Sequence, residues 1–218
     1  MNLSRNGLFQ QLPLAALAPL QAACEPVALR AGQVLSKASD ADPLVYFLTS
    51  ATVALLVQGD GDTSLAVGLV GPGSAVGLAH ALDTPSEPLL WQVQTPGQAC
   101  QLPASVLREL LHQHPAMLVG ISHHLWTLVA HIATVAAAAQ SQDIATRLAG
   151  WLVLSAQQAQ STSLYLTHDH LAHMLGVRRV SITLAAGALR EQGLLAYSRG
   201  HVHILDWTGL LRAAKTRS

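Results

Sequence analysis

The sequence predicts an α+β protein made of three successive parts, and three observations carry that prediction. Short β-rich runs separated by Gly, Pro and Asp clusters fill residues 26 to 102. From residue 115 onward, apolar residues recur at alternating spacings of three and four. Residues 167 to 218 combine a surplus of basic side chains with a helix-turn-helix pattern. We therefore expect antiparallel β-structure, one long helix and a winged helix-turn-helix, in that order.

The β-rich part is expected to be antiparallel. Its runs, such as LVYFLTS and TVALLVQ, are short and are separated by turn-forming clusters such as QGDGD. Strands at this spacing favour a sandwich or barrel over a parallel sheet. The segment GPGSAVG, residues 71 to 77, looks like a loose dinucleotide-binding fingerprint, but no series of βα units follows it. We interpret it as a turn.

The long helix is expected to join two copies of the chain. Its apolar positions keep a heptad spacing through three repeats, whereas a helix without a partner drifts by about 20° per heptad. We predict a parallel homodimer helix about 37 Å long, at about 1.5 Å per residue. A core helix packed within one chain is the alternative. The predicted seam consists of Leu118, Ile121, Leu125, Leu128, Ile132 and Val135.

The composition argues against a membrane or exported protein. Half of the residues are apolar and 11% are charged, and His131 interrupts even the apolar stretch from residue 125 to 139. A spanning helix needs about 18 or more apolar residues. The N-terminal LPLAALAPLQAAC resembles a signal peptide, but Gln21 stands where a lipoprotein cleavage box requires Leu. The two cysteines, Cys24 and Cys100, provide no disulfide framework. We expect a cytoplasmic protein with no membrane partner.

The net charge of zero hides an asymmetry between the two ends of the chain. Residues 1 to 166 hold five basic and nine acidic side chains, a net charge of −4. Residues 167 to 218 hold seven basic and three acidic side chains, a net charge of +4. The C-terminal part is therefore expected to face an anionic partner.

The most specific pattern is LTHDHLAHMLGVRRVSITLAAGAL, residues 166 to 189. Thr167 is placed to cap a short helix, Ala172 is small where a second helix would cross, and Gly176 suits the positive φ of the turn. The following LLAYSRGHVHIL predicts two strands joined at Arg199 and Gly200, which form a wing. A preceding helix is expected to begin with Ser141 as its N-cap.

These residues resemble the Crp/Fnr family of bacterial transcription regulators. VYFLTSATVALLV resembles the early strands of that family, LVGPGSAVGL its glycine-bearing turn, and the C-terminal pattern its DNA-binding end. The resemblance implies an antiparallel β jelly-roll sensor in residues 1 to 114, a dimerisation helix in 115 to 140, and a winged helix-turn-helix in 141 to 218. It also implies that a homodimer binds a near-palindromic operator in double-stranded DNA and acts on RNA polymerase.

The resemblance assigns DNA contacts to the C-terminal part. Arg179 corresponds to an arginine that recognises guanine in the family, and Ser181 to a hydroxyl that contacts phosphate. Val180 and Leu184 replace a glutamate and a second arginine, and would either contact thymine methyl groups or be covered by a neighbouring helix. The predicted DNA-binding residues are Thr167, Arg178, Arg179, Val180, Ser181, Thr183, Leu184, Tyr197 and Arg199.

The effector is where the sequence departs from the family. Members that bind cyclic AMP use a glutamate in the turn segment and an arginine-serine pair after it. Here GSAVGLAHAL has no acidic residue, and no arginine lies between Arg30 and Arg108. We therefore expect no cofactor and an effector other than cyclic AMP, with a haem or redox sensor using His80 or Cys100 as the alternative. The predicted effector segment comprises Gly73, Ser74, Ala75, Val76, Gly77 and Leu78.

Three histidines in the C-terminal pattern, His168, His170 and His173, raise the question of a metal site. No cysteine and no second carboxylate joins them, so solvated or phosphate-facing roles are expected instead. The sequence also lacks a nucleophile elbow, a phosphate loop with its lysine and a spaced pair of acids, and we expect no enzyme. A ligand-binding or scaffold protein without DNA-binding activity is the alternative from another class.

Overall fold

The computed structural model describes residues 7–35, 41–58, 64–82 and 89–215. The chain forms two compact units. Residues 1–55 with 70–131 make the first unit, and residues 56–69 with 132–218 make the second.

The N-terminal half contains the antiparallel β-structure expected from the sequence. One four-stranded sheet has the order β1 (Glu25–Leu29), β8 (Gly97–Pro103), β3 (Leu44–Leu48) and β6 (Ala75–Val76). A second has the order β2 (Val34–Leu35), β7 (Leu89–Thr95), β4 (Thr52–Gln58) and β5 (Ser64–Val70). In the first sheet Phe47 of β3 lies opposite Cys100 of β8 and Ala75 of β6. The α+β fold class is thus confirmed.

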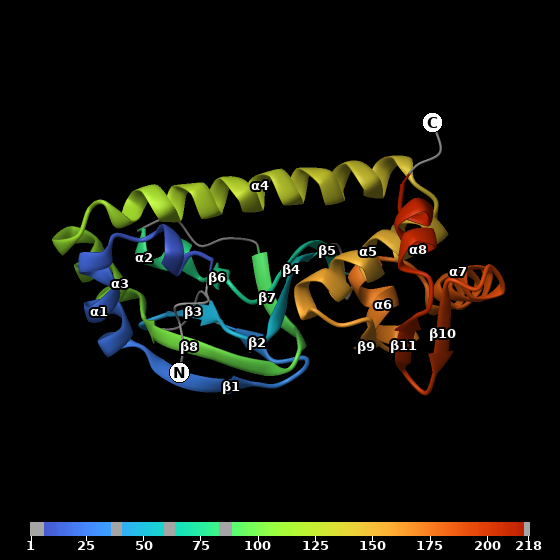
Figure 1. The fold of residues 1–218 in the computed structure, drawn as a ribbon, viewed down its shortest axis with the longest axis horizontal. Helices are drawn as coiled ribbons and strands as arrows, with labels where there is room; N and C mark the ends of the chain where they lie inside the picture. The colour runs from blue at the N-terminus through green and yellow to red at the C-terminus, as the bar shows by residue number, and fades with distance from the viewer. Residues whose placement is uncertain (1–6, 36–40, 59–63, 83–88, 216–218) are drawn as a thin grey trace. The chain divides into compact units, whose positions relative to one another are not determined.

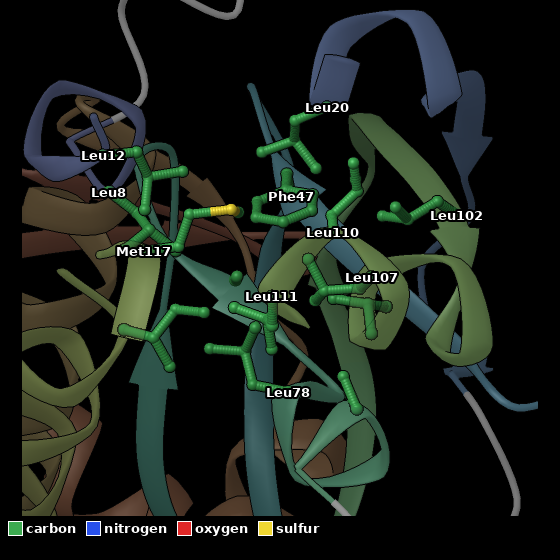
Figure 2. Close-up of a cluster of buried hydrophobic side chains, with 14 of the residues drawn as sticks. Leu8, Leu12, Leu20, Phe47, Leu78, Leu102, Leu107, Leu110, Leu111 and Met117 are labelled. Atoms are coloured by element: carbon green, nitrogen blue, oxygen red, sulfur yellow. The ribbon is translucent and has the colours of Figure 1, made fainter. Parts of the chain in front are cut away.

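The core of the first unit lies between the β1–β8–β3–β6 sheet and short helices (Figure 2). These are the 3₁₀ helix η2 (Phe9–Gln11), α1 (Leu14–Ala23), α2 (Leu78–Ala81) and α3 (Ala104–Gln113). The stretch that resembles a signal peptide forms α1, with Ala16 and Leu20 fully buried. Leu8 donates its N–H to Gly73 O at 3.0 Å, and the rings of Phe9 and Phe47 meet edge-on at 5.1 Å. The N-terminal segment is therefore part of this core.

The long helix α4 (Met117–Ser141) has 25 residues, as the spacing predicted (Figure 1). It is apolar enough to be a candidate membrane span by length and composition, with a mean hydropathy of 1.3 and no Asp, Glu, Lys or Arg. The helix nevertheless lacks the run of about 18 apolar residues that a spanning helix needs, because His123, His124 and His131 lie within it. Its first turns are buried at Met117, Gly120 and Ile121.

The structure corrects which face of α4 is free. Ile121, predicted to lie at the dimer seam, is 3% exposed and belongs to the core of its own chain, and Leu125 packs against that core. Leu128, Ile132 and Val135 are half-buried, whereas Leu118 is 41% exposed. The same spacing of three and four predicts a face against the chain's own core as readily as a face against a second helix.

The second unit contains the winged helix-turn-helix elements (Figure 1). Helix α5 (Ile144–Ala159) is followed by β9 (Ser163–Tyr165), α6 (His168–Leu175) and α7 (Arg179–Glu191). Then β10 (Leu195–Ser198) and β11 (His201–Ile204) form an antiparallel hairpin, with β9 on the other side of β11, before α8 (Trp207–Ala213). The predicted cap at Ser141 is wrong. Asp143 caps α5 by accepting from Thr146 N at 2.7 Å, because Ser141 still belongs to α4.

Gly120 and Gly150 offer a matched pair of helix substitutions. A Cβ at Gly120 would stand 2.9 Å from Gln11 O, whereas a Cβ at Gly150 would meet nothing within 4 Å. Gly120→Ala should lower the free energy of unfolding by about 1–3 kcal/mol through overpacking, and Gly150→Ala should raise it by about 0.5–1 kcal/mol through helix propensity. Urea denaturation followed by circular dichroism measures both. A stabilised Gly120→Ala variant would contradict the close passage of α4 over Gln11.

The burial of His124 on α4 should make stability pH-dependent. Its Nε2 lies 3.1 Å from Ala75 O, and burial lowers its pKa, although this hydrogen bond acts in the opposite direction. The unfolded chain therefore binds protons that the folded chain excludes, so stability is complete above the unfolded pKa of about 6.5 and is lost as the pH falls below it. The melting temperature should be lower at pH 5.5 than at pH 7.5. His124→Gln should reduce that difference, and an unchanged difference would contradict the assignment. Burial also lowers the pKa of His170, so this residue of the second unit should add its own pH dependence to the melting temperature. His170→Gln measures that contribution separately from that of His124.

Candidate nucleic-acid interface

Local chemistry sets the geometry between α6 and α7. The Thr167 side chain caps α6 by accepting from His170 N at 3.1 Å, and Gly176 ends the helix in the left-handed region at φ +62°. Val177 N then bonds to Ala172 O at 3.0 Å. A Cβ at Gly176 would be strained in this conformation. Ala172 is 7% exposed, in agreement with the small residue expected where α6 and α7 pack together.

Helix α7 has one buried side and one exposed side. Ile182, Ala185, Ala186 and Leu189 are at most 6% exposed and pack into the second unit. On the other side, five of the predicted DNA-binding residues are exposed: Arg178, Arg179, Val180, Thr183 and Leu184. Ser181 is half-buried.

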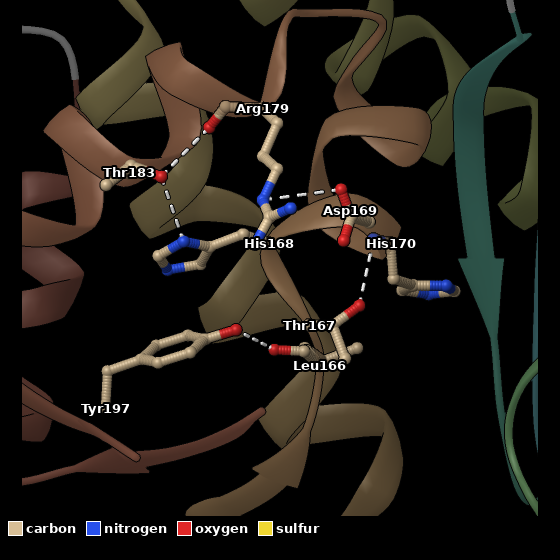
Figure 3. A network of polar contacts seen from close by, with 8 residues as sticks. All are labelled: Leu166, Thr167, His168, Asp169, His170, Arg179, Thr183 and Tyr197. Atoms are coloured by element: carbon tan, nitrogen blue, oxygen red, sulfur yellow. Dashed lines mark hydrogen bonds and ion pairs between the residues drawn. The ribbon is translucent and has the colours of Figure 1, made fainter. Parts of the chain in front are cut away.

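A polar network connects the exposed side of α7 to the start of α6 (Figure 3). The guanidinium of Arg179 lies 3.4 Å from the carboxylate of Asp169, Nε to Oδ1. The hydroxyl of Thr183 donates to Arg179 O at 3.1 Å and lies 3.0 Å from His168 Nδ1. The ion pair joins side chains that are 66% and 69% exposed, so its contribution to stability is small.

The network continues into the wing strand β10. The rings of His168 and Tyr197 lie 4.3 Å apart, and the Tyr197 hydroxyl donates to Leu166 O. Burial, followed by the charge of Asp169, raises the pKa of Tyr197 to about 12. Tyr197 is therefore a neutral donor at pH 7. The sequence predicts Tyr197 as a DNA-binding residue but carries no local signal for this bond to Leu166 O.

The three histidines of α6 have different surroundings. His173 lies 2.6 Å from Ser64 Oγ through its Nε2, within the second unit. Burial lowers the pKa values of His168 and His170, with a further contribution from Arg179 for His168 and from His173 for His170. Within the described part of the chain, Nε2 of each of these two is buried without a hydrogen-bond partner. No group of three potential metal ligands occurs among the same residues.

The wing turn places another arginine at the surface. Arg199 has φ +48° and Gly200 has φ +84°, and the Arg199 side chain is exposed. The tip of the wing therefore carries an exposed positive charge in the same unit as α7. With Arg178 and Arg179 at the start of α7, it forms the cationic part of the candidate interface.

The predicted effector segment of the first unit is largely apolar and buried. Ala75, Val76 and Leu78 are 2%, 1% and 3% exposed, and Ala75 and Leu78 belong to the core cluster. Gly73 O accepts from Leu8 N, and Arg108 donates to His80 O at 2.9 Å. The Gly73 carbonyl and the Arg108 guanidinium therefore already have hydrogen-bond partners within the chain.

The cysteine of the redox alternative is poorly placed for reaction. Cys100 is 2% exposed, and burial raises its pKa. Burial also raises the pKa of Cys24, which packs against the same core. Because the thiolate is the reactive form, these surroundings disfavour oxidation.

The sequence matches two family models. Residues 26–114 match the cyclic nucleotide-binding domain, and residues 146–213 match the Crp-like helix-turn-helix domain. No curated protein matches the sequence.

Solved structures of low sequence identity share the fold. A protein from Eubacterium rectale ATCC 33656 assigned to the Crp/Fnr family of transcriptional regulators has a TM-score of 0.75 at 16% identity, covering 96% of this chain and 98% of its own. The c-di-GMP responsive global regulator CLP of Xanthomonas campestris has a TM-score of 0.72 at 16% identity, covering 89% and 100%. A Crp/Fnr transcriptional regulator of Thermus thermophilus has a TM-score of 0.69 at 24% identity, with the same coverage. Carrying both domains in this order and with this fold, the chain belongs to the Crp/Fnr family of transcription regulators.

Proposed function

We propose that this chain is a cytoplasmic, homodimeric regulator that binds a near-palindromic operator in double-stranded DNA and acts on RNA polymerase. Residues 1 to 114 would form the effector domain and residues 141 to 218 the DNA-binding domain. The observation that carries the proposal is the exposed N-terminal half of α7, where Arg178 and Arg179 stand together on a helix whose other side is buried.

The start of α7 is suited to binding phosphate. The first N–H groups of a helix have no partner within it and attract phosphate, and two arginines at this end strengthen the attraction. An arginine that reaches the major groove forms two hydrogen bonds with the O6 and N7 atoms of guanine. Arg179 is the candidate for this contact, and it would have to leave Asp169 to make it. The surplus charge of +4 in residues 167 to 218 supplies the general attraction to DNA.

Other predicted DNA-binding residues would position the domain on the phosphate backbone. Arg199 at the wing tip, the Thr167 cap and Ser181 are the proposed phosphate contacts. Tyr197 would act indirectly, since its hydroxyl holds Leu166 O beside the cap.

We propose that the dimer forms through a face of α4 other than the one predicted from the sequence. Val119, Trp126 and Val129 are 74%, 72% and 52% exposed. With Ser122 and Ala133, which are also exposed, they repeat at spacings of three and four residues. This seam lies opposite the face that begins with Met117 and Ile121 in the core. A second copy of α4 would bury these side chains in the manner of a coiled coil.

We propose an effector other than cyclic AMP. A buried cyclic phosphate needs charge-assisted partners such as an arginine. The segment from Gly73 to Leu78 instead presents three apolar side chains to the core, and Arg108 is engaged with His80 O. An apolar ligand, or none, suits this segment better than a phosphate.

Two arginine variants test DNA binding. If Arg179 contacts a guanine edge, Arg179→Ala should lose about 1–3 kcal/mol on the cognate duplex and little on a scrambled one. If Arg199 contacts phosphate, Arg199→Ala should weaken both alike and should reduce the slope of log affinity against log salt by about two per dimer. Fluorescence anisotropy at several salt concentrations measures these effects, with an operator obtained by genome-wide pull-down.

Equal losses of affinity on the cognate and scrambled duplexes for Arg179→Ala would show that Arg179 contacts phosphate and not a guanine edge. A chain that binds no genomic fragment at any salt concentration would contradict the proposed function and favour a ligand-binding or scaffold protein without DNA-binding activity.

Glutamates in α4 test the dimer face. Trp126→Glu combined with Val129→Glu should give monomers in analytical ultracentrifugation, because charge repulsion would replace the apolar contact. Thr127→Glu, which is exposed beside the seam, is the matched control and should remain dimeric. Monomers from Leu125→Glu with an undiminished melting temperature would restore the seam predicted from the sequence, and a dimeric Trp126/Val129 double variant would contradict the one proposed here.

A further inference from the structure

The exposed side of α7 carries an apolar strip that no described part of the second unit covers. Val180 is 67% exposed and Leu184 is 70% exposed. Four residues apart on a helix, they lie on one side, about 6 Å from each other along the axis. The apolar residues that α7 packs inside the domain, such as Ile182 and Leu189, are at most 2% exposed. The strip is therefore additional to the side that holds the domain together.

The charged surroundings of the strip restrict what can cover it. Arg178 and Arg179 precede Val180 directly, and the helix N-terminus adds partial positive charge. A partner that covers Val180 and Leu184 must therefore be anionic and must still offer apolar groups at the same place. The major groove of DNA meets both conditions, because phosphates line its edges and the C5-methyl of thymine is the apolar group on its floor.

The hydrogen-bonding capacity of this side of α7 is small. The hydroxyl of Thr183 already donates to Arg179 O and contacts His168 Nδ1. Val180 and Leu184 have no polar side-chain atoms. Arg178 and Arg179 are therefore the exposed side chains at this end of α7 that can recognise a base by hydrogen bonds, whereas Val180 and Leu184 can distinguish a base pair only by apolar contact.

We infer that Val180 and Leu184 determine operator specificity by contacting thymine methyl groups next to the base recognised by Arg179. The inference rests on the proposed DNA-binding function and specifies its operator. The distance of about 6 Å between the two side chains corresponds to about two base-pair steps of about 3.4 Å, so each half-site should contain thymines within about two steps of each other. Burying one methyl group against an aliphatic side chain should change affinity about fourfold.

The test removes the methyl groups and nothing else. In the operator obtained by pull-down, each thymine of a half-site is replaced in turn by deoxyuridine, which keeps the same hydrogen bonds. The full-length protein should bind the duplex about fourfold more weakly for each contacted methyl group lost, and about sixteenfold more weakly when both half-sites are changed. Fluorescence anisotropy measures the affinities at one fixed salt concentration.

Variants then assign each methyl group to a side chain. In Leu184→Ala, the deoxyuridine that weakens binding of the unchanged protein at the Leu184 contact should have no further effect, and Val180→Ala should behave likewise at its own thymine. Leu205→Ala is the matched control, because Leu205 is 64% exposed in the same unit but lies outside α7, and its response to deoxyuridine should equal that of the unchanged protein. Circular dichroism checks that each variant is folded.

The outcomes separate this inference from the proposed function. Specific binding that depends on Arg179 but is unaffected by deoxyuridine would overturn the methyl contacts and leave DNA recognition in place. Equal responses of Leu184→Ala and the unchanged protein to every deoxyuridine would overturn the assignment to Leu184. A chain without a preferred duplex would overturn the proposed function, and the inference with it.

Discussion

The close passage of α4 over the N-terminal segment is the constraint around which the first unit is built. Gly120 allows the helix to approach Gln11 O at a distance that leaves no room for a Cβ. The same segment reaches the turn of Gly73 through the Leu8 N–H and places Phe9 against Phe47. Leu8, Phe9 and Leu12 are thereby buried at 2%, 1% and 7% exposure. The glycine turn, the N-terminal segment and the first turns of α4 are thus packed as one group, and none can shift without disturbing the others.

In the second unit, side chains of the domain itself hold the ends of α5 and α6. Thr167 caps α6, Asp143 caps α5, and the Arg147 guanidinium donates to Leu175 O at the last turn of α6. None of these contacts uses Val180 or Leu184, which are 67% and 70% exposed, so these two side chains contribute little to the fold. Positions 180 and 184 can then change in sequence without loss of the fold, and this explains how Val180 and Leu184 can stand where the family resemblance implies charged residues.

The sequence was sufficient for features that depend on local chemistry. Thr167 as a cap and Gly176 as a left-handed turn were predictable because few residue types perform these roles. The face of α4 was not, since an apolar repeat records that a face is covered without recording by what. The N-cap of α5 was placed two residues early because Ser and Asp are both good caps, and the choice depends on where α4 ends. The contacts His168–Thr183 and Tyr197–Leu166 join residues distant in sequence, and neither pair has a signature that a single chain reveals.

The ion pair between Arg179 and Asp169 also affects what Arg179 loses on meeting a partner. A free arginine side chain samples many rotamers, and ordering it costs up to about 2 kcal/mol in conformational entropy. Asp169 lies 3.4 Å from the Arg179 guanidinium, although the two side chains remain 66% and 69% exposed. Under the proposed function, Arg179 would give up this contact and order its side chain again on DNA, so both changes would subtract from the free energy of its base contact.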